Sequence, residues 1–309
     1  MKKIIALLVL LVFVSGCSSL DSVNSFFKNL PGIKMISPSG GGKAFIGGTK
    51  SVTVEILQPP EKGKVSKDIP LRVVVNVKND GESDTEGMVC ITGLNSDVFE
   101  GSDPCKCEEF SLYSRSRSQD EKSEGESKTI KFEEGTPIMG ELVVNDFSIT
   151  SIVRYDYKTY ASVEACVAKD VFTSKDCKSR QDAKVSGVSS GPIQIGSVSQ
   201  ELLTTGDDEY TMSLFIEVSH NGEGRFYDPS MEKDACGDDS DKVNKRVNVK
   251  LYNAPGSVTC SPLVFKAKEE KGTATCTITG IEARNYKSLM NVELSYTYEV
   301  RESNNFEVV

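Results

Sequence analysis

The sequence lacks tryptophan and has only one histidine, His220, among its 309 residues. Zinc motifs that need two histidines are therefore excluded. A catalytic triad of the Ser-His-Asp type would have to use His220. Neighbouring acids such as Glu133 and Glu134 leave a glycosidase pair open, but exposed charged loops offer such pairs by accident. We therefore expect that the protein is not an enzyme.

Long hydrophobic runs are also missing. The longest apolar run, Ile4 to Val14, has eleven residues. As a helix it would span roughly 16 Å, which is about half of a bilayer's hydrocarbon core. We therefore expect no permanent transmembrane helix.

An excess of positive charge is absent as well. The chain has 36 basic and 45 acidic residues, a formal charge of −9. Removal of an N-terminal leader containing Lys2 and Lys3 leaves 34 basic residues against 45 acidic ones, a charge of −11. Such a chain is a poor ligand for polyanions, so we expect no nucleic-acid partner.

What the sequence does have begins with its leader. Two lysines follow the initiating methionine, the apolar run comes next, and the small residues of Val14 to Cys17 close it. That order is typical of an export signal. Val14 to Cys17 resembles the lipobox of prokaryotic lipoproteins, which implies that residues 1–16 are a removed signal peptide. It also implies that Cys17 is acylated and anchors the exported protein to the cell-envelope membrane, on the extracytoplasmic side. The alternative is an ordinary cleaved export signal with a cysteine there by chance.

Residues 17–50 are expected to form the lipidated cysteine and a flexible tether. Glycine gathers in Ser37 to Gly42 and again at Gly47-Gly48, with few long apolar stretches between. Chains of this composition behave as flexible coils. The tether would hold a folded part clear of the membrane surface.

Two patterns of alternating apolar residues recur at a shift of 141 residues. Leu71 to Val77, followed by Asn-Asp-Gly, matches Met212 to Val218, followed by His-Asn-Gly. Val153 to Tyr157 matches Leu294 to Tyr298 at the same shift. Alternation with a period of two is typical of strands, and Asn/Asp-Gly pairs reverse the chain between them. We interpret the constant shift as a tandem duplication.

The expected fold class is all-β, with two tandem antiparallel immunoglobulin-like β-sandwiches after the signal peptide and tether. The first sandwich is expected over residues 51–168, a linker over 169–190 and the second sandwich over 191–309. Val73 to Gly81 resembles the early strand pair of CARDB-type immunoglobulin-like domains, which recur in archaeal and bacterial cell-surface proteins. That resemblance implies an adhesion or scaffolding module rather than a catalyst.

Nine cysteines suit an exported chain better than a cytosolic one. With Cys17 reserved for lipid, the remaining eight form an even number, which suits complete pairing. These eight are the disulfide candidates: Cys90, Cys105, Cys107, Cys166, Cys177, Cys236, Cys260 and Cys276.

Two of the pairs are expected to be local. Cys166 and Cys177 lie close together at the end of the first repeat, where a bridge would tie its last strand to the linker. Cys260 and Cys276 flank a predicted hairpin. Each bridge would close a short loop and stabilise the fold by a few kcal/mol, about 2–3 kcal/mol for the shorter one.

The other four cysteines leave alternatives open. Cys90 is expected to pair with Cys105 or with Cys107, and the other member of that pair with Cys236. The second bridge would join the two repeats. Zinc competes for Cys105-Lys-Cys107, but structural zinc sites use a two-residue spacing and a second Cys or His pair. The sequence shows neither, so disulfides are favoured.

An acidic cluster offers a weak candidate metal site, and calcium is the one candidate cofactor. Asp234, Asp238, Asp239 and Asp241 lie close together in an excursion of the second repeat. Calcium binds several oxygens in a flexible loop, but this cluster lacks the EF-hand spacing and its closing glutamate. A solvated acidic loop is the ordinary interpretation.

Tyrosines recur on one strand face. Tyr155 and Tyr157 share such a face, and Tyr296 and Tyr298 repeat the pair. Aromatic rows can form a contact surface for a glycan or protein, although they more often fill a core or stabilise cross-strand pairs. Their recurrence in both repeats favours the structural role. His220 falls in a turn where the first repeat has asparagine, which favours a structural role for it too.

Together these features predict an exported, membrane-anchored lipoprotein that acts as a non-catalytic structural or adhesion module at the cell surface, with a protein or glycan partner. The alternative is an extracytoplasmic lipoprotein that captures a cation or glycan through loops of the second repeat. Loops are where ligand-binding residues concentrate on a rigid scaffold.

Overall fold

The computed structural model describes residues 45–309, except 95–97, 100–101, 118–121, 137–145, 171–173, 205–208, 235, 238–244 and 267–268. The predicted signal peptide, Cys17 and most of the predicted tether lie outside the described residues. The described part is all-β, with strands in almost entirely antiparallel sheets and no helix. This agrees with the fold class expected from alternating apolar residues.

The strands follow one another along two similar halves of the chain. The first half contains β1 (Val52–Gln58), β2 (Gly63–Val65), β3 (Arg72–Asn79), β4 (Thr85–Thr92), β5 (Cys105–Leu112), β6 (Ser116–Arg117), β7 (Lys122–Ser123), β8 (Ser127–Glu133) and β9 (Asp146–Val167). The second contains β10 (Arg180–Val188), β11 (Ile193–Thr204), β12 (Glu209–His220), β13 (Arg225–Tyr227), β14 (Arg246–Tyr252), β15 (Ser257–Cys260), β16 (Leu263–Val264), β17 (Lys271–Glu282) and β18 (Tyr286–Val308).

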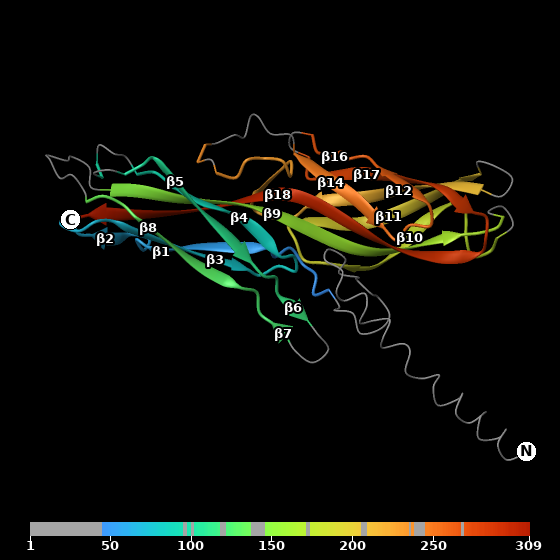
Figure 1. Ribbon diagram of the computed structural model, residues 1–309, viewed down its shortest axis with the longest axis horizontal. Helices are drawn as coiled ribbons and strands as arrows, with labels where there is room; N and C mark the ends of the chain where they lie inside the picture. The colour runs from blue at the N-terminus through green and yellow to red at the C-terminus, as the bar shows by residue number, and fades with distance from the viewer. Residues whose placement is uncertain are drawn as a thin grey trace, which may run out of the picture. The chain divides into compact units, whose positions relative to one another are not determined.

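The strands form one small sheet, one large sheet and a short hairpin. The small sheet has the order β1-β3-β8, and the hairpin pairs β6 with β7. The large sheet runs β15-β17-β12-β11-β10-β9-β18-β14-β16. In addition β4 pairs with β9 and carries β5, whereas β13 and β2 pair with β18. Figure 1 labels these strands, except β13 and β15.

The centre of the large sheet is the pair β9 and β18. They are antiparallel neighbours along their whole length, from Asp146 opposite Glu307 to Val167 opposite Tyr286, and Figure 1 shows them side by side. Neither strand contains glycine or proline, which would weaken or interrupt so long a ladder. Alternating side chains keep one face of each strand turned to the core from end to end.

A pseudo-twofold axis passes through this pair. Asp156 lies opposite Thr297, and Thr297 is the residue that the 141-residue shift makes equivalent to Asp156. The Thr297 hydroxyl donates a hydrogen bond to Asp156 Oδ1 at 3.0 Å. On either side of the axis Tyr155 lies opposite Tyr298 and Tyr157 opposite Tyr296. Asp156 and its equivalent Thr297 therefore meet at the axis, and the tyrosine pair of one repeat faces the tyrosine pair of the other.

The strand pairs β1–β3 and β11–β12 show the same shift of 141 residues. Val52 of β1 lies opposite Asn79 of β3, and Ile193 of β11 lies opposite His220 of β12. Each residue number in the second pair exceeds its counterpart in the first by 141. Backbone register thus supports the duplication inferred from the apolar pattern.

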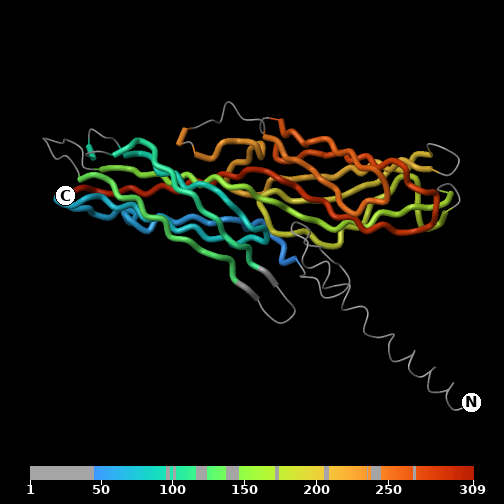
Figure 2. Tube along the Cα trace, in the orientation of Figure 1, coloured from blue at the N-terminus to red at the C-terminus, as the bar shows by residue number. Residues whose placement is uncertain are grey.

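The repeats exchange the ends of their last strands. Near the end of β18, Asn304 Nδ2 donates hydrogen bonds to the carbonyls of Ile56 and Pro59, next to β1. Near the middle of β9, the Thr159 hydroxyl donates to the Ile193 carbonyl of β11. The C-terminal half of each long strand therefore packs on the other repeat. Figure 2 shows the C-terminal strand beside the N-terminal strands, in agreement with the pairing of β18 and β2.

The strands β3 and β12 occupy the segments where alternating apolar residues predict strands. Residues 169–190, predicted to be a linker, contain β10, a sheet strand that pairs with both β9 and β11. The described residues belong to one compact unit. The predicted boundaries of the two sandwiches, at residues 168 and 191, therefore stay a prediction. The pairing of β9 with β18 joins the two repeats in one body.

The end of the predicted tether is attached to the fold. The backbone amides of Ile46 and Gly47 donate hydrogen bonds to the Glu82 carboxylate at 2.6 and 2.9 Å. The Gly191 amide donates to the Gly48 carbonyl at 3.0 Å. Residues 45–50 are therefore part of the folded unit, because these bonds fix their backbone between the two repeats.

Candidate functional site

A loop of the second repeat lies on the face of the central sheet that is turned away from the core. We call residues 228–234 and 236–237, between β13 and β14, the covering loop. Lys233 Nζ lies 2.8 Å from Asp156 Oδ2 of β9, and Arg154 Nη2 of β9 donates to the Gly237 carbonyl at 2.9 Å. Cys236 is bonded to Cys105 of β5. The loop is thus held on the first repeat by an ion pair, a hydrogen bond and a disulfide.

The covering loop explains a row of buried side chains. Val153 and Tyr155 of β9 point into the core, so Ile152 and Arg154 point to the opposite face. On an uncovered sheet they would meet solvent, but Ile152 is 1% exposed and Arg154 is 0% exposed. The loop therefore makes a third layer over this part of the sheet.

Beneath the loop lies a buried ion network. Arg154 Nε donates to Glu299 Oε2 at 2.6 Å, across directly opposed positions of β9 and β18. Arg301 Nε donates to the other oxygen, Glu299 Oε1, at 2.7 Å. Glu299 is 1% exposed. Two guanidinium groups therefore share this one carboxylate and satisfy both of its oxygens.

The sequence gives no direct signal for this network. Arg154, Glu299 and Arg301 occupy polar positions of alternating strands, which ordinarily face water. The only indication was the cysteine-containing excursion that is present in the second repeat and absent from the first. The cysteine of this insertion is bonded to Cys105, and the bond attaches the loop over these charges.

All four predicted disulfides are present and use the eight candidate cysteines: Cys90–Cys107, Cys105–Cys236, Cys166–Cys177 and Cys260–Cys276. Cys90 lies directly opposite Cys107 in the ladder of β4 and β5, as Cys260 lies opposite Cys276 in β15 and β17. This register decides the alternative that the sequence left open. It leaves Cys105 for Cys236, and that bond joins the two repeats as expected.

Loss of the Cys105–Cys236 bridge should destabilise the fold more than loss of a local bridge. It closes a loop of 131 residues, against 11 for Cys166–Cys177. Chain entropy gives about 4–5 kcal/mol for the longer loop and about 3 kcal/mol for the shorter one. Urea unfolding of Cys105→Ser/Cys236→Ser should therefore show a larger loss than Cys166→Ser/Cys177→Ser. Equal losses would contradict the long-range constraint.

A groove lies between the covering loop and the ladder of β4 and β5. Its floor comes from opposed residues of the two strands, such as Met88 and Glu109, and its wall comes from the loop. Lys128 Nζ reaches in from β8 and donates to the Glu109 carbonyl at 3.0 Å. The side chains that give the groove its character are two methionines and four acids: Glu86, Met88, Glu109, Met231, Glu232 and Asp234.

The predicted calcium cluster is described only at its first residue. Asp234 is exposed and lines the groove. Asp238, Asp239 and Asp241 lie outside the described residues. The structure therefore leaves the calcium site as a prediction.

The four repeated tyrosines lie in the core rather than on a surface. Tyr155, Tyr157, Tyr296 and Tyr298 are each at most 2% exposed. Tyr155 and Tyr296 accept hydrogen bonds from the equivalent backbone amides of the two repeats, Val52 and Ile193, both at 3.4 Å. These positions therefore offer no contact surface for a glycan, and the structural role favoured by their recurrence is the observed one.

Burial shapes the ionisation of these phenols. It raises the pKa of Tyr157 and that of Tyr298 to about 12, and it also raises the pKa of Tyr155 and that of Tyr296 well above the usual value of a phenol. Each hydroxyl is hydrogen-bonded, so the neutral phenol is satisfied where it lies. The cluster is a neutral structural core at physiological pH.

His220 also has a structural place. Its Nε2 lies 3.1 Å from the Tyr298 hydroxyl, and its ring packs on Phe226 at 5.0 Å between centroids. In the first repeat the equivalent Asn79 donates through Nδ2 to the Ser83 carbonyl at 2.8 Å. Both side chains fill the same turn, as the sequence match predicted.

Residues 187–191 have the spacing Gly-x-Ser-x-Gly. In some hydrolases this spacing forms a tight turn that carries the catalytic serine, so the surroundings of Ser189 have to be considered. Ser189 is fully buried, and its hydroxyl oxygen accepts a hydrogen bond from the Tyr160 amide at 2.8 Å. The one histidine bonds Tyr298 instead. Ser189 therefore stabilises a strand end and lacks the partner that would make it a nucleophile.

Acid should weaken the fold through His220. Burial, with the nearby Lys245 charge, lowers the pKa of His220 below its usual 6.5. The unfolded chain therefore binds the proton first as pH falls below 6.5, and stability drops until pH reaches the folded pKa. His220→Asn, which copies the first repeat, should lose less stability between pH 7 and pH 5 in urea unfolding. An unchanged pH profile would contradict this.

A family match covers the leader of the chain. Residues 1–18 match the prokaryotic membrane lipoprotein lipid attachment site. Among curated proteins none matches the chain. In the part of the chain that the structure describes, no helix has the length and apolar character needed to cross a bilayer.

The leader and the fold together define a class. The protein is an exported lipoprotein, anchored to the membrane on its extracytoplasmic side, whose folded part is all-β and braced by disulfides.

Proposed function

We propose that this lipoprotein is a non-catalytic structural or adhesion module of the cell surface, built from two tandem immunoglobulin-like sandwiches of the CARDB type. The observation that carries the proposal is the full-length ladder of β9 and β18. It makes two repeats into one stiff body, which suits a spacer or an adhesive unit better than a hinged receptor.

The strand exchange is what would make the module resist separation of its repeats. Pulling them apart requires breaking the central ladder, the Cys105–Cys236 bond and the buried Arg154–Glu299 pair. Sheet hydrogen bonds and a covalent bond would thus share one load. An adhesion module between a membrane anchor and a surface partner has to bear such a load.

Crosslinking in intact envelopes tests this function. Cells carrying the full chain are treated with a short amine-reactive crosslinker, and captured partners are identified by mass spectrometry. We expect a surface protein or glycoprotein to be captured, and we expect attachment of cells lacking the chain to fall. If attachment is unchanged and no partner is captured, the adhesion proposal fails.

A second candidate function rests on the groove beside the covering loop. Its acids and its loop wall suit an extracytoplasmic lipoprotein that captures a cation or a glycan. Thermal unfolding with and without millimolar calcium tests the cation version, and a glycan array tests the other. If calcium leaves the melting temperature unchanged and no glycan on the array is bound, this second function fails and the structural function remains as the proposal.

A further inference from the structure

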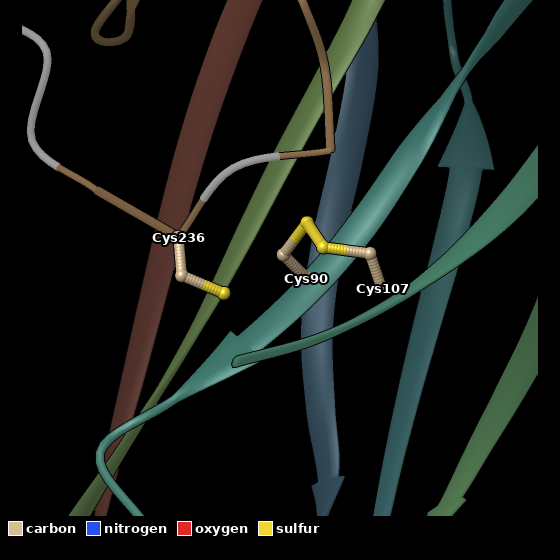
Figure 3. Close-up of side chains that lie close together, drawn as sticks. All are labelled: Cys90, Cys107 and Cys236. Carbon is tan, nitrogen blue, oxygen red and sulfur yellow. A yellow bond between two sulfur atoms is a disulfide. The ribbon is translucent and has the colours of Figure 1, made fainter. Parts of the chain in front are cut away.

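The four cysteines of the first two disulfides bring their sulfur atoms together. Cys90 comes from β4, Cys105 and Cys107 from β5, and Cys236 from the covering loop. The Sγ atoms of Cys105 and Cys107 are 3.9 Å apart. Those of Cys90, Cys107 and Cys236 lie within 4.8 Å of one another. Figure 3 shows the Cys236 sulfur turned toward the Cys90–Cys107 bond.

These separations fit a four-thiolate metal centre. Zinc binds thiolates at about 2.3 Å in a tetrahedron, which sets each pair of sulfurs roughly 3.8 Å apart. The Cys105 and Cys107 sulfurs already stand near that distance. Cys90, Cys107 and Cys236 form a set within 4.8 Å that does not include Cys105. To surround one cation, the two bonded pairs have to separate and the Cys90 and Cys105 sulfurs have to draw together. Cys105-Lys-Cys107 has no second cysteine pair nearby in the sequence. The fold supplies one, as Cys90 and Cys236.

The thiols would stay together after the disulfides open. Cys90 and Cys107 remain opposite each other through the backbone ladder of β4 and β5. The covering loop keeps the Arg154 bond to the Gly237 carbonyl and the Lys233–Asp156 ion pair. Neither contact involves sulfur. The site is therefore assembled by groups that reduction does not touch.

We propose that Cys90, Cys105, Cys107 and Cys236 bind one zinc-type divalent cation when their two disulfides are reduced. Each disulfide takes two electrons and two protons from one dithiol, which becomes a disulfide itself. The cation then displaces the four thiol protons and is held by four thiolates. The covering loop is thus fixed by the Cys105–Cys236 disulfide in the oxidised protein and by the metal in the reduced one.

A cobalt titration tests the site, because cobalt(II) in a thiolate tetrahedron has characteristic absorption bands and zinc displaces it. The mature chain with Cys17→Ser is reduced by a phosphine, and its native far-UV circular dichroism is checked before metal is added. We expect one cobalt per chain, the four-thiolate spectrum and displacement by zinc. Oxidised protein should bind none at this site.

Two variants separate this centre from the other thiols. Cys236→Ser should change the cobalt absorption spectrum to that of a three-thiolate site. It should also weaken the cobalt affinity by more than the roughly 10–100-fold loss that follows removal of a residue hydrogen-bonded to a metal ligand. Cys166→Ser/Cys177→Ser should leave the cobalt spectrum and the cobalt affinity unchanged. A Cys236→Ser titration identical to the wild type would overturn the proposal.

Alkylation gives a second measurement if reduction loosens the fold. Zinc should restore the dichroism and protect these four thiols from iodoacetamide, relative to Cys166, Cys177, Cys260 and Cys276 in the same sample. Mass spectrometry reads the protection residue by residue. Equal labelling of all eight thiols with zinc present would also overturn the proposal.

Discussion

Replacing Cys17 by serine is expected to move nearly all of the protein from the membrane fraction to the soluble fraction. The lipid attachment site spans residues 1–18, and Cys17 supplies the thiol that carries the acyl chains. Stable anchoring takes more than one acyl chain, and a serine hydroxyl does not replace the thiol as acceptor. Fractionation after an alkaline wash measures the change, and mass spectrometry of the mature N-terminus identifies the lipid.

Ser18→Ala is the matched control, since it alters the neighbouring residue and keeps the thiol. It should stay in the membrane fraction and keep the lipid mass. If Cys17→Ser remained membrane-bound after the alkaline wash, the anchor would have to lie elsewhere in the chain.

Replacing Arg154 by methionine is expected to lower the free energy of unfolding by about 3 kcal/mol or more, because it leaves Oε2 of the buried Glu299 carboxylate without its guanidinium donor. Arg154 and Glu299 are 0% and 1% exposed. The remaining partner, Arg301, is 30% exposed and holds only one carboxylate oxygen. The change also removes the hydrogen bond to the Gly237 carbonyl, so the covering loop should be cut faster by protease.

Two further variants make this prediction specific. Arg154→Met/Glu299→Leu removes both charges and should recover most of the lost stability, because burying neither ion avoids the desolvation cost. Lys287→Met breaks an exposed ion pair with Glu164 on the same two strands and should leave urea unfolding unchanged. An Arg154→Met loss no greater than that of Lys287→Met would show that the buried network contributes nothing.

The sequence predicted the local features well, because alternation and turns are written in adjacent residues. The apolar positions of β3 and β12, the Asn-Gly turns that follow them and the two short-range disulfides all follow from residues close together in the chain. The constant shift of 141 residues correctly implied that Asn79 and His220 fill equivalent turns.

The sequence did not predict which partner completes each sheet. An alternating strand specifies a buried face, and that face is the same whether its neighbour comes from its own repeat or from the other. The sequence therefore contained no sign that β9 and β18 pair along their whole length, or that the predicted linker contains the sheet strand β10. Sequence also could not show that Arg154 and Glu299 are buried, because a loop far along the chain covers them.

The amino-acid sequence alone thus indicated export, lipid attachment, the high strand content and the repetition of a β unit. Each of these depends on neighbours in the sequence. Tertiary structure alone decided the joining of the repeats, the burial of an ion pair and the meeting of four sulfur atoms. These depend on contacts between residues more than a hundred positions apart, and the local pattern of a strand carries no record of them.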